Sequence, residues 1–372
     1  MTIRFGIVGA AGRGNSFVRS IQANPATELT ALCDLRTDAV AASAAELGVT
    51  HTFTDAEQMY DSGQIDAVVI GTPMQFHAPQ AIAALARDLH VLSEVTSGVS
   101  VEECRDLVSA VRGSRGRYML AENYTYTKNN VLVRELARLG LFGEIYYGEG
   151  AYIHELKALN EKTTWRRHWQ TGVNGCTYGT HSLGPVLQWF CEPRRRPDRV
   201  VAVSAVGTGH HYTDPRGDAY EMEDSVTMMC RMASGGMIQI RVDMLSNRPH
   251  LMTHYVLQGT EGSYESGDGF RGESKIWLRS RNDVPTWEPL ADLEEEFLPE
   301  FWKNPPEEAL AAGHGGGDYW EVEDFVRAIR DESDLAIGID ESMDMTLPGL
   351  ISQQSISTGS AWVAVPDSRN WT

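Results

Sequence analysis

The sequence contains few cysteines, and their spacing does not indicate a disulfide framework. Five occur in 372 residues, none of them in a Cys-x-x-Cys pair: Cys33, Cys104, Cys176, Cys191 and Cys230. A disulfide-rich secreted domain and a structural zinc site therefore both lack their usual signature. An odd number of scattered cysteines fits a reducing compartment, and we expect the protein in the cytoplasm.

Long apolar runs and an excess of positive charge are also missing. No stretch approaches the roughly 20 apolar residues of a membrane span, and a strand that begins at residue 3 leaves no room for a signal peptide. The formal net charge is −19, so phosphate backbones and anionic membranes would be repelled. We therefore expect neither nucleic acid nor membrane as a partner. The length is comfortable for two globular domains.

The first third of the chain predicts a nucleotide-binding domain. A β-rich run over residues 3–8 leads into the loop Gly9-Ala10-Ala11-Gly12-Arg13-Gly14, and a helix over residues 16–21 follows. The amides of such a loop can approach a pyrophosphate at the helix N-terminus. Ala11 replaces the central glycine of the GxGxxG pattern, so the loop alone is a weak signal.

The next predicted strand supplies the stronger signal. Residues 28–33 end in Asp34, twenty residues after Gly14. A carboxylate at this point can accept hydrogen bonds from the adenosine ribose and repels a 2′-phosphate. The sequence therefore favours NAD, while Arg36 leaves NADP open.

The pattern of alternating strands and helices predicts an α/β fold with two domains. Strands expected over residues 66–71, 90–94 and 118–123 alternate with helices over 79–86 and 101–112, which is typical of a doubly wound Rossmann domain, here residues 1–123. Residues 124–372 predict an α+β domain for substrate binding and oligomerisation. We expect there a large, mainly antiparallel sheet, formed by strands over 144–153, 200–207, 225–232, 237–244 and 253–258. One face of this sheet is expected to pack on a partner in a homodimer or homotetramer.

The motifs of the chain resemble those of the glucose-fructose oxidoreductase / inositol dehydrogenase superfamily. They are the glycine loop, Asp34, Gly71-Thr72-Pro73 with His77, Glu94, and His181 in the second domain. Two usual catalytic groups of that superfamily are absent. The chain reads Glu94-Val95-Thr96 where typical members have Glu-Lys-Pro, and Thr177 stands where they have Asp.

A narrower branch fits better. Glu122-Asn123-x-x-Tyr126, Gly150-Ala151-Tyr152-Ile153-His154, Tyr178-x-Thr180-His181 and Gly313-His314-Gly315-Gly316 resemble the NAD-dependent glycosidases typified by α-N-acetylgalactosaminidase. The resemblance implies tightly bound NAD that is returned unchanged after each cycle. It also implies cleavage by transient oxidation at carbon 3 of the sugar, elimination, water addition and re-reduction. The alternatives are a sugar or polyol dehydrogenase that releases a ketosugar, and a non-catalytic NAD sensor.

Candidate site residues follow from the residues and the resemblance together. We expect His181 to act at the carbon 3 hydroxyl. Tyr178, on the same side of one helical turn, would serve carbon 2 or the leaving group, with Tyr124 and Tyr126 as further candidates after a strand end. The expected cofactor contacts are Gly9, Ala11, Gly12, Arg13, Gly14, Asn15, Asp34, Arg36, Thr72, Pro73, His77, Glu94 and Asn123.

The segment from Lys162 to His168 allows two interpretations. It is either a solvated basic turn or a site for an anionic sugar such as a sulfoquinovoside, since arginine binds sulfonate and carboxylate by forked contacts. The expected substrate contacts are Lys162, Trp165, Arg166, Arg167 and His168, together with His314 before a later helix. No metal is expected. His210-His211 and the acidic residues after them are better explained as a solvated loop, and residues 193–196 as a surface turn.

Overall fold

The computed structural model describes residues 2–192, 198–269 and 272–371, so the expected turn at 193–196 lies outside the described residues. The chain forms two compact units. The first comprises Met1–Tyr126, Pro306–Met343 and Ser368–Thr372, and the second comprises Thr127–Pro305 and Asp344–Asp367. The first unit is thus not the single stretch 1–123 expected from the sequence, because segments from late in the chain complete it.

The first unit is built on a six-stranded parallel sheet in the order β3-β2-β1-β4-β5-β6. Its strands are β1 (Ile3–Val8), β2 (Thr27–Cys33), β3 (His51–Phe53), β4 (Ala67–Ile70), β5 (His90–Glu94) and β6 (Tyr118–Ala121). Every side chain of β4 is fully buried, as expected for a parallel strand covered on both faces. The predicted doubly wound Rossmann fold is confirmed.

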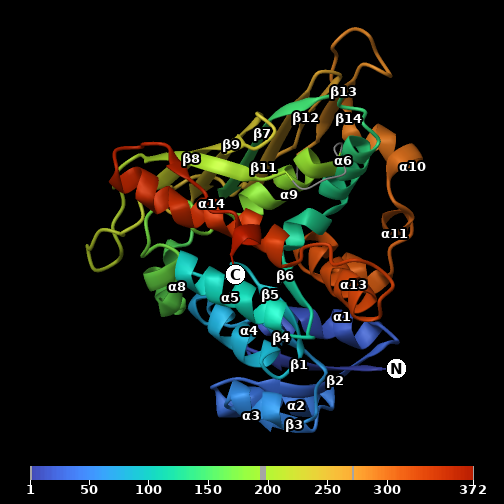
Figure 1. Cartoon of the computed structure of the whole chain (residues 1–372), viewed down its shortest axis with the longest axis vertical. Helices are drawn as coiled ribbons and strands as arrows, with labels where there is room; N and C mark the ends of the chain where they lie inside the picture. The colour runs from blue at the N-terminus through green and yellow to red at the C-terminus, as the bar shows by residue number, and fades with distance from the viewer. Residues whose placement is uncertain (1, 193–197, 270–271, 372) are drawn as a thin grey trace. The chain divides into compact units, whose positions relative to one another are not determined.

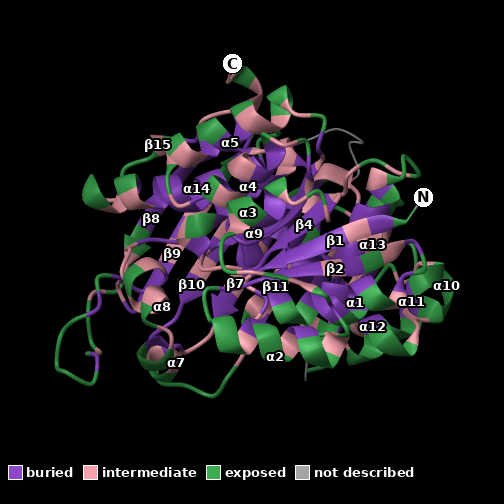
Figure 2. Ribbon diagram, turned by 90° about the horizontal axis from the view of Figure 1, so that it is seen from below, coloured by how far each residue is buried: buried purple, intermediate pink, exposed green. Residues whose placement is uncertain are grey.

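Helices surround this sheet and leave its strands as the buried layer (Figure 2). Those that follow the strands are η1 (Arg13–Phe17), α1 (Val18–Ala23), α2 (Thr37–Leu47), α3 (Ala56–Asp61), η2 (Met74–Phe76), α4 (His77–Leu85), α5 (Val101–Gly113) and η3 (Asn123–Tyr126). The C-terminal part of the chain adds α12 (Glu307–Ala311), η6 (His314–Gly316), α13 (Gly317–Ile329) and η7 (Ser368–Asn370). The helix expected over 16–21 starts earlier, at Arg13, as a 3₁₀ turn.

The second unit is built on a nine-stranded sheet in the order β14-β13-β12-β11-β7-β10-β9-β8-β15. Its strands are β7 (Ile145–Ile153), β8 (Val200–Gly207), β9 (Ser225–Met232), β10 (Met237–Asp243), β11 (Met252–Gly259), β12 (Gly262–Glu265), β13 (Lys275–Leu278), β14 (Glu288–Pro289) and β15 (Val363–Ala364). The central pair β7 and β10 is parallel, and the other neighbouring pairs are antiparallel. The expected mainly antiparallel sheet is confirmed.

The second unit also contains several helices. They are α6 (Lys128–Arg138), α7 (Lys157–Lys162), α8 (Thr164–Trp169), α9 (Thr180–Cys191), η5 (Leu290–Leu293), α10 (Glu294–Phe297), α11 (Glu300–Lys303) and the later part of α14 (Ile339–Ser357). Helix α9 packs along β7, β10 and β11, and Figure 1 shows α9 and α14 on the same side of the sheet. The described helices include none that is both long and apolar enough to cross a membrane.

Helix α9 approaches β7 so closely that two strand positions must lack a side chain. A Cβ added at Gly150 would lie 1.8 Å from the carbonyl oxygen of Ser182, and one at Gly148 would lie 2.5 Å from Cγ1 of Val186. Because Ser182 directly follows His181, this contact also fixes the height of the His181 backbone above the sheet. The hydroxyl of Tyr255 on β11 donates a hydrogen bond of 2.6 Å to the carbonyl of His181 and ties the same turn to the sheet.

We therefore expect Gly150→Ala to destabilise the second unit. The added methyl group must push α9 away from β7, and overpacking of this kind costs about 1–3 kcal/mol. Urea unfolding monitored by circular dichroism measures the change. Gly113→Ala is the matched control, because a Cβ at Gly113 meets no atom within 4 Å. Equal unfolding midpoints for the two variants would show that the close approach is not required.

Candidate functional site

The glycine loop of the first unit, residues 9–14, packs its backbone directly against that of Gly71 and forms a cradle. A Cβ at Gly14 would lie 2.6 Å from Cγ2 of Ile7, and one at Gly71 would lie 2.5 Å from the amide nitrogen of Gly14. Gly9 has a φ of +83°, in the region that favours glycine. Ala11 and Gly12 lie at the turn itself, and Asn15 lies in η1. The cradle lets backbone amides approach a pyrophosphate without side chains in the way.

Asp34 is held at the end of β2 by bonds from both sides. Oδ2 accepts a hydrogen bond of 2.9 Å from the amide of Ala11, and Oδ1 accepts one of 3.0 Å from Nε of Arg36. Burial alone would raise the pKa of this carboxyl, but the bonds from Arg36 and Ala11 outweigh it and lower that pKa. Asp34 is therefore a fixed anion where the adenosine ribose is expected. Arg36 forms its ion pair with Asp34.

Arg13 is neutralised by two carboxylates. Its Nε donates to Glu94 over 2.6 Å, and its two terminal nitrogens donate to Asp318 on α13 over 2.7 Å each. Burial would lower the pKa of Arg13, but Glu94 and Asp318 raise it, and Arg13 in turn lowers the pKa of Asp318. Forked contacts of this kind are among the strongest ion pairs in proteins. Arg13 thus links the glycine loop to β5 and α13.

Asp318 also contacts two other predicted site residues of the first unit, His314 and Asn123. Nδ1 of His314 lies 3.0 Å from its Oδ1, and Nδ2 of Asn123 donates to the same oxygen over 3.0 Å. The ring of Tyr124 packs edge to face against His314, with centroids 5.6 Å apart. Tyr126 is buried in the same 3₁₀ turn as Tyr124.

His77 joins two loops at the carboxyl ends of the parallel strands. Its Nε2 lies 2.8 Å from the carbonyl oxygen of Thr72, and its Nδ1 lies 2.9 Å from that of Thr96. Burial lowers the pKa of His77, against the two carbonyls, which raise it. Both ring nitrogens are therefore engaged within the protein. Thr72 is fixed further by donating to Gln80 over 2.7 Å, and Pro73 precedes η2.

These residues fit a dinucleotide. The cradle around Gly14 would hold the pyrophosphate, and Asp34 would hold the ribose. The buried Oδ1 of Asn123 accepts no hydrogen bond from the described residues, so it can accept one from a ligand.

A cluster of aromatic and imidazole rings forms the candidate acid–base site of the second unit. The ring of His181, near the start of α9, lies 5.3 Å from the Tyr178 ring and 5.1 Å from the Tyr152 ring, between centroids. The Tyr152 and Tyr178 rings are themselves 5.8 Å apart. Tyr178 and His181 are therefore brought together as expected. The predicted reason was wrong, because Tyr178 lies in the turn before α9 and not on its first helical turn.

His154 extends this cluster at the end of β7. Its Nδ1 lies 2.9 Å from the hydroxyl oxygen of Tyr152, and its ring packs edge to face against His250, with centroids 5.0 Å apart. Burial, helped by the neighbouring His250, His181 and Arg166, lowers the pKa of His154 to about 4. His154 is therefore neutral at pH 7 and can accept a hydrogen bond from the Tyr152 hydroxyl.

The basic segment divides into engaged and exposed residues. Arg167 stacks on Tyr220 at 4.5 Å and donates to the carbonyl of Ala219, so it anchors a loop. Arg166 stacks on Trp165 at 4.2 Å, and its charge acts on His154. Lys162 and His168 are exposed. Arg166 is thus the member of this segment that bears on the ring cluster.

Three residues with clear roles in these networks were missed in the sequence. Asp318 organises the first unit, and Tyr152 and His154 complete the ring cluster of the second. The i, i+2 spacing of Tyr152 and His154 was a usable signal, because it places both side chains on one face of a strand. For Asp318, whose partner Arg13 is 305 residues away, no local signal existed.

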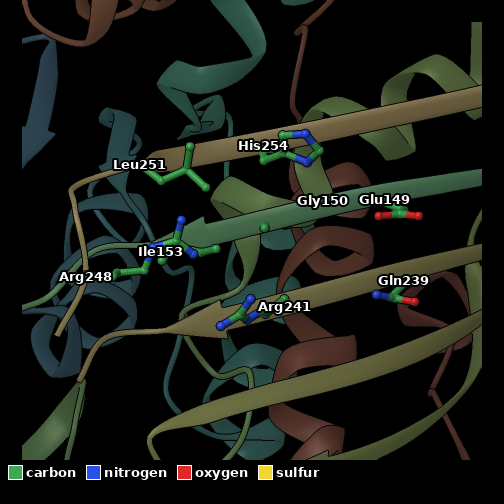
Figure 3. Close-up of a pocket in the computed structure, with 9 residues that line it drawn as sticks. Glu149, Gly150, Ile153, Gln239, Arg241, Arg248, Leu251 and His254 are labelled. Atoms are coloured by element: carbon green, nitrogen blue, oxygen red, sulfur yellow. The ribbon is translucent and has the colours of Figure 1, made fainter. Parts of the chain in front are cut away.

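A cavity of about 250 Å³ lies on the opposite face of the same sheet (Figure 3). Its lining includes Glu149, Ile153, Arg241 and His254, from β7, β10 and β11. Residues 149, 151 and 153 of β7 point away from the face that carries Gly150 and Tyr152, because side chains alternate along a strand. This cavity is thus separated from the ring cluster by the sheet itself.

The histidines and acidic residues considered above as metal ligands instead hydrogen-bond within a loop. His211 lies 2.7 Å from Asp224, and Glu223 accepts a hydrogen bond of 2.9 Å from the amide of Gly209. Among the described residues, no group of three or more His, Cys, Asp or Glu side chains is arranged to hold a metal ion.

Comparisons with known proteins match the two parts of the chain to two family models. Residues 3–122 match the model of the oxidoreductase family with an NAD-binding Rossmann fold, and residues 126–371 match that of the glycosyl hydrolase 109 C-terminal domain. The cofactor of the Rossmann domain is therefore NAD. A levoglucosan dehydrogenase solved with NADH shares the fold, with a TM-score of 0.82 at 20% identity over 99% of this chain and 100% of that chain.

Curated relatives align with almost the whole chain. A glycosyl hydrolase family 109 protein of Shewanella woodyi is 30% identical, covering 98% of this chain and 85% of the relative. An alpha-N-acetylgalactosaminidase of Shewanella oneidensis is 29% identical, covering 98% and 84%. The resemblance inferred from the motifs is confirmed: the chain belongs to the glycosyl hydrolase 109 family of NAD-dependent glycosidases.

Proposed function

We propose that this enzyme hydrolyses a glycoside by transient oxidation at carbon 3 of the sugar, and that its sugar is anionic. The observation that carries the first part is the packing of His181 against two tyrosines, one of which has a neutral imidazole at its hydroxyl. Ordinary glycosidases use a pair of carboxylates instead. Imidazole and phenol are the groups expected where protons move between weakly acidic carbon and oxygen atoms near neutral pH.

The first unit would hold the cofactor through the glycine loop, Asp34 and Asn123. When bound, NAD supplies the oxidation of carbon 3 and its later reduction. The other residues of this unit keep that loop in place, since Arg13 ties it to Glu94 and Asp318.

The second unit would supply the proton transfers. His181 accepts the proton of the carbon 3 hydroxyl as that carbon becomes a ketone. The ketone acidifies the proton on carbon 2, and a tyrosine removes it while the bond from carbon 1 to the aglycone oxygen breaks. Water then adds to carbon 1, the tyrosine returns a proton to carbon 2, and His181 returns one to the carbon 3 oxygen.

Tyr152 is the better candidate for the carbon 2 base. Its hydroxyl lies 2.9 Å from Nδ1 of His154, which gives its own proton a destination. Tyr178 packs against both Tyr152 and His181, and we place it beside the leaving group. Tyr124 and Tyr126 belong to the first unit, where Tyr124 packs on His314. For these two residues and for His314, contact with the substrate stays a proposal.

An anionic sugar is supported by the charge near the ring cluster. The protein carries a net charge of −19, yet Arg166 acts on His154 from α8. A guanidinium can bind a sulfonate or carboxylate by two parallel hydrogen bonds. We propose a sulfonated sugar, such as a sulfoquinovoside, with Arg166 as its anchor. We also propose a cytoplasmic homodimer or homotetramer formed through the sheet of the second unit.

Replacement of His181 tests the reaction. We expect His181→Ala to lower kcat by about 10²–10⁴-fold, because it removes the base for the carbon 3 hydroxyl. Turnover is measured with a panel of chromogenic glycosides, with neither NAD nor an electron acceptor added. His210→Ala, at an exposed loop histidine, is the control and should keep wild-type turnover. Stoichiometric release of NADH by the wild type would instead indicate a dehydrogenase that frees a ketosugar.

Replacement of Asp34 tests the choice of cofactor. Asp34→Ser removes the carboxylate that repels a 2′-phosphate and frees Arg36 to bind one. We expect the ratio of Kd for NADP to Kd for NAD to fall at least about tenfold, or ~1.4 kcal/mol. Fluorescence titration of the cofactor-free protein measures both constants. Asp38→Ser changes an exposed acid of the following helix, and a similar shift there would argue against a specific role of Asp34.

Replacement of Arg166 tests the anionic sugar. Arg166→Ala should raise KM for a sulfonated or carboxylated glycoside by about tenfold or more, while KM for the matching neutral glycoside changes much less. Arg279→Ala, an exposed arginine of the same unit, is the control for net charge. If the wild type prefers the neutral sugar, the anionic part of the proposal is wrong, while the hydrolytic part is untouched.

A further inference from the structure

We propose that His154 is the proton acceptor that makes the Tyr152 hydroxyl a base, and that it exchanges this proton with solvent on the side of His250. The inference rests on the proposed function, since it adds a step to the removal of the carbon 2 proton. It follows from one short contact and one ring packing in the second unit. The hydroxyl oxygen of Tyr152 lies 2.9 Å from Nδ1 of His154, and the His154 ring packs against His250 at 5.0 Å.

A tyrosine needs such a partner to act as a base. A phenol has a pKa of about 10, so at neutral pH its oxygen carries a proton and is a poor acceptor for another. If that proton moves to an adjacent imidazole while the oxygen takes up the carbon 2 proton, no free phenolate has to exist. The general requirement is a base within about 2.6–3.2 Å of the proton it takes, and His154 meets it.

The surroundings of His154 favour its neutral form at rest. Because they also disfavour its protonated form, the transfer from Tyr152 must coincide with the uptake of the carbon 2 proton by Oη. The titratable and charged groups that face it come from three elements, namely His181 of α9, Arg166 of α8 and His250 of the loop before β11, while Glu155 is the acid beside it in the chain. Together with burial they lower the pKa of His154 to about 4, so the ring is neutral at pH 7. A neutral ring with its proton on Nε2 presents the lone pair of Nδ1 to the Tyr152 hydroxyl.

The step balances in protons and electrons. The proton on carbon 2 goes to Oη of Tyr152, and the proton of Oη goes to Nδ1 of His154. The electron pair of the carbon–hydrogen bond forms the double bond between carbons 1 and 2, and the aglycone oxygen leaves with the pair from carbon 1. The proton on His154 then balances the negative charge of the aglycone, which takes up a proton from His154 or from water.

His250 marks where this proton meets solvent. His154 is half-buried at the end of β7, whereas His250 is exposed. A proton on His154 can therefore exchange with water at this edge of the sheet. Once His154 has lost its proton to the aglycone or to water, the carbon 2 proton held on Oη of Tyr152 can follow it to Nδ1 and be replaced from solvent. The proton later returned to carbon 2 then comes from the solvent.

The decisive variants are His154→Gln and His154→Phe. The glutamine carbonyl can still accept a hydrogen bond from Tyr152 but cannot take its proton, and phenylalanine does neither. We expect both to lower kcat by about 10²–10⁴-fold, with KM changed by less than about threefold. Turnover in D₂O should place deuterium on carbon 2 with the wild type and less with His154→Gln. His210→Gln is the matched control on an exposed loop and should behave as the wild type.

Two results would overturn the proposal. One is a His154→Gln variant with kcat within about threefold of wild type, since His154 would then only orient the hydroxyl. The other is an undiminished deuterium fraction at carbon 2 in the residual turnover of that variant. If the wild type itself neither hydrolyses glycosides nor exchanges carbon 2, the proposed function fails instead.

A measurement on the resting protein keeps the inference testable even if the variants fold poorly. Nitrogen-15 NMR of the histidine-labelled wild type should show His154 as the Nε2–H tautomer at pH 7, titrating near 4. The Nδ1 signal should shift in Tyr152→Phe. A His154 ring that carries its proton on Nδ1 at pH 7 would contradict the proposal independently of any activity.

Discussion

The distance between helix α9 and strand β7 is the constraint on which the candidate chemistry of the second unit depends. It is short because Gly148 and Gly150 have no side chain, so the carbonyl of Ser182 can approach the backbone of the strand directly. The next residue outward along the same face of the strand is Tyr152, and its ring is thereby brought against His181. A bulkier residue at position 150 would separate the two rings by moving the helix that carries one of them.

The two units handle charge in different ways. In the first, ionised groups are paired and fixed: Arg13 faces Glu94 and Asp318, and Arg36 faces Asp34. Such pairs give a rigid frame, because each partner would be costly to bury alone. In the second unit, rings that can gain or lose a proton gather together, with His154 kept neutral by burial and by the groups around it, Arg166 among them. The frame suits a cofactor that must be held, and the rings suit protons that must move.

Much of the fold could be predicted from the sequence, because most strands of both sheets are marked by apolar or alternating patterns. The strands that were missed are short: β12 and β13 have four residues each, β3 has three, and β14 and β15 have two each. The site was predicted in part: His181 and Tyr178 are three residues apart and meet, although α9 starts only at Thr180. Tyr152 on β7 meets His181 on the helix that packs on that strand, and Asp318 reaches Arg13 from 305 residues away, so neither contact has a local signature. Arg166 and Arg167 were both predicted as substrate contacts, because the sequence does not distinguish two adjacent arginines. The structure distinguishes them, since Arg167 stacks on Tyr220.

The pairing of Arg13 has a consequence for how the cofactor is retained. An arginine beside a pyrophosphate would ordinarily act as its counter-ion, but the guanidinium here is already matched by two carboxylates. The phosphates must then be held by the amides and the helix dipole at the glycine loop, which are partial charges fixed at short range. Attraction of this kind is screened much less by dissolved ions than the pull between two full charges across water. Cofactor retention should accordingly vary little with ionic strength.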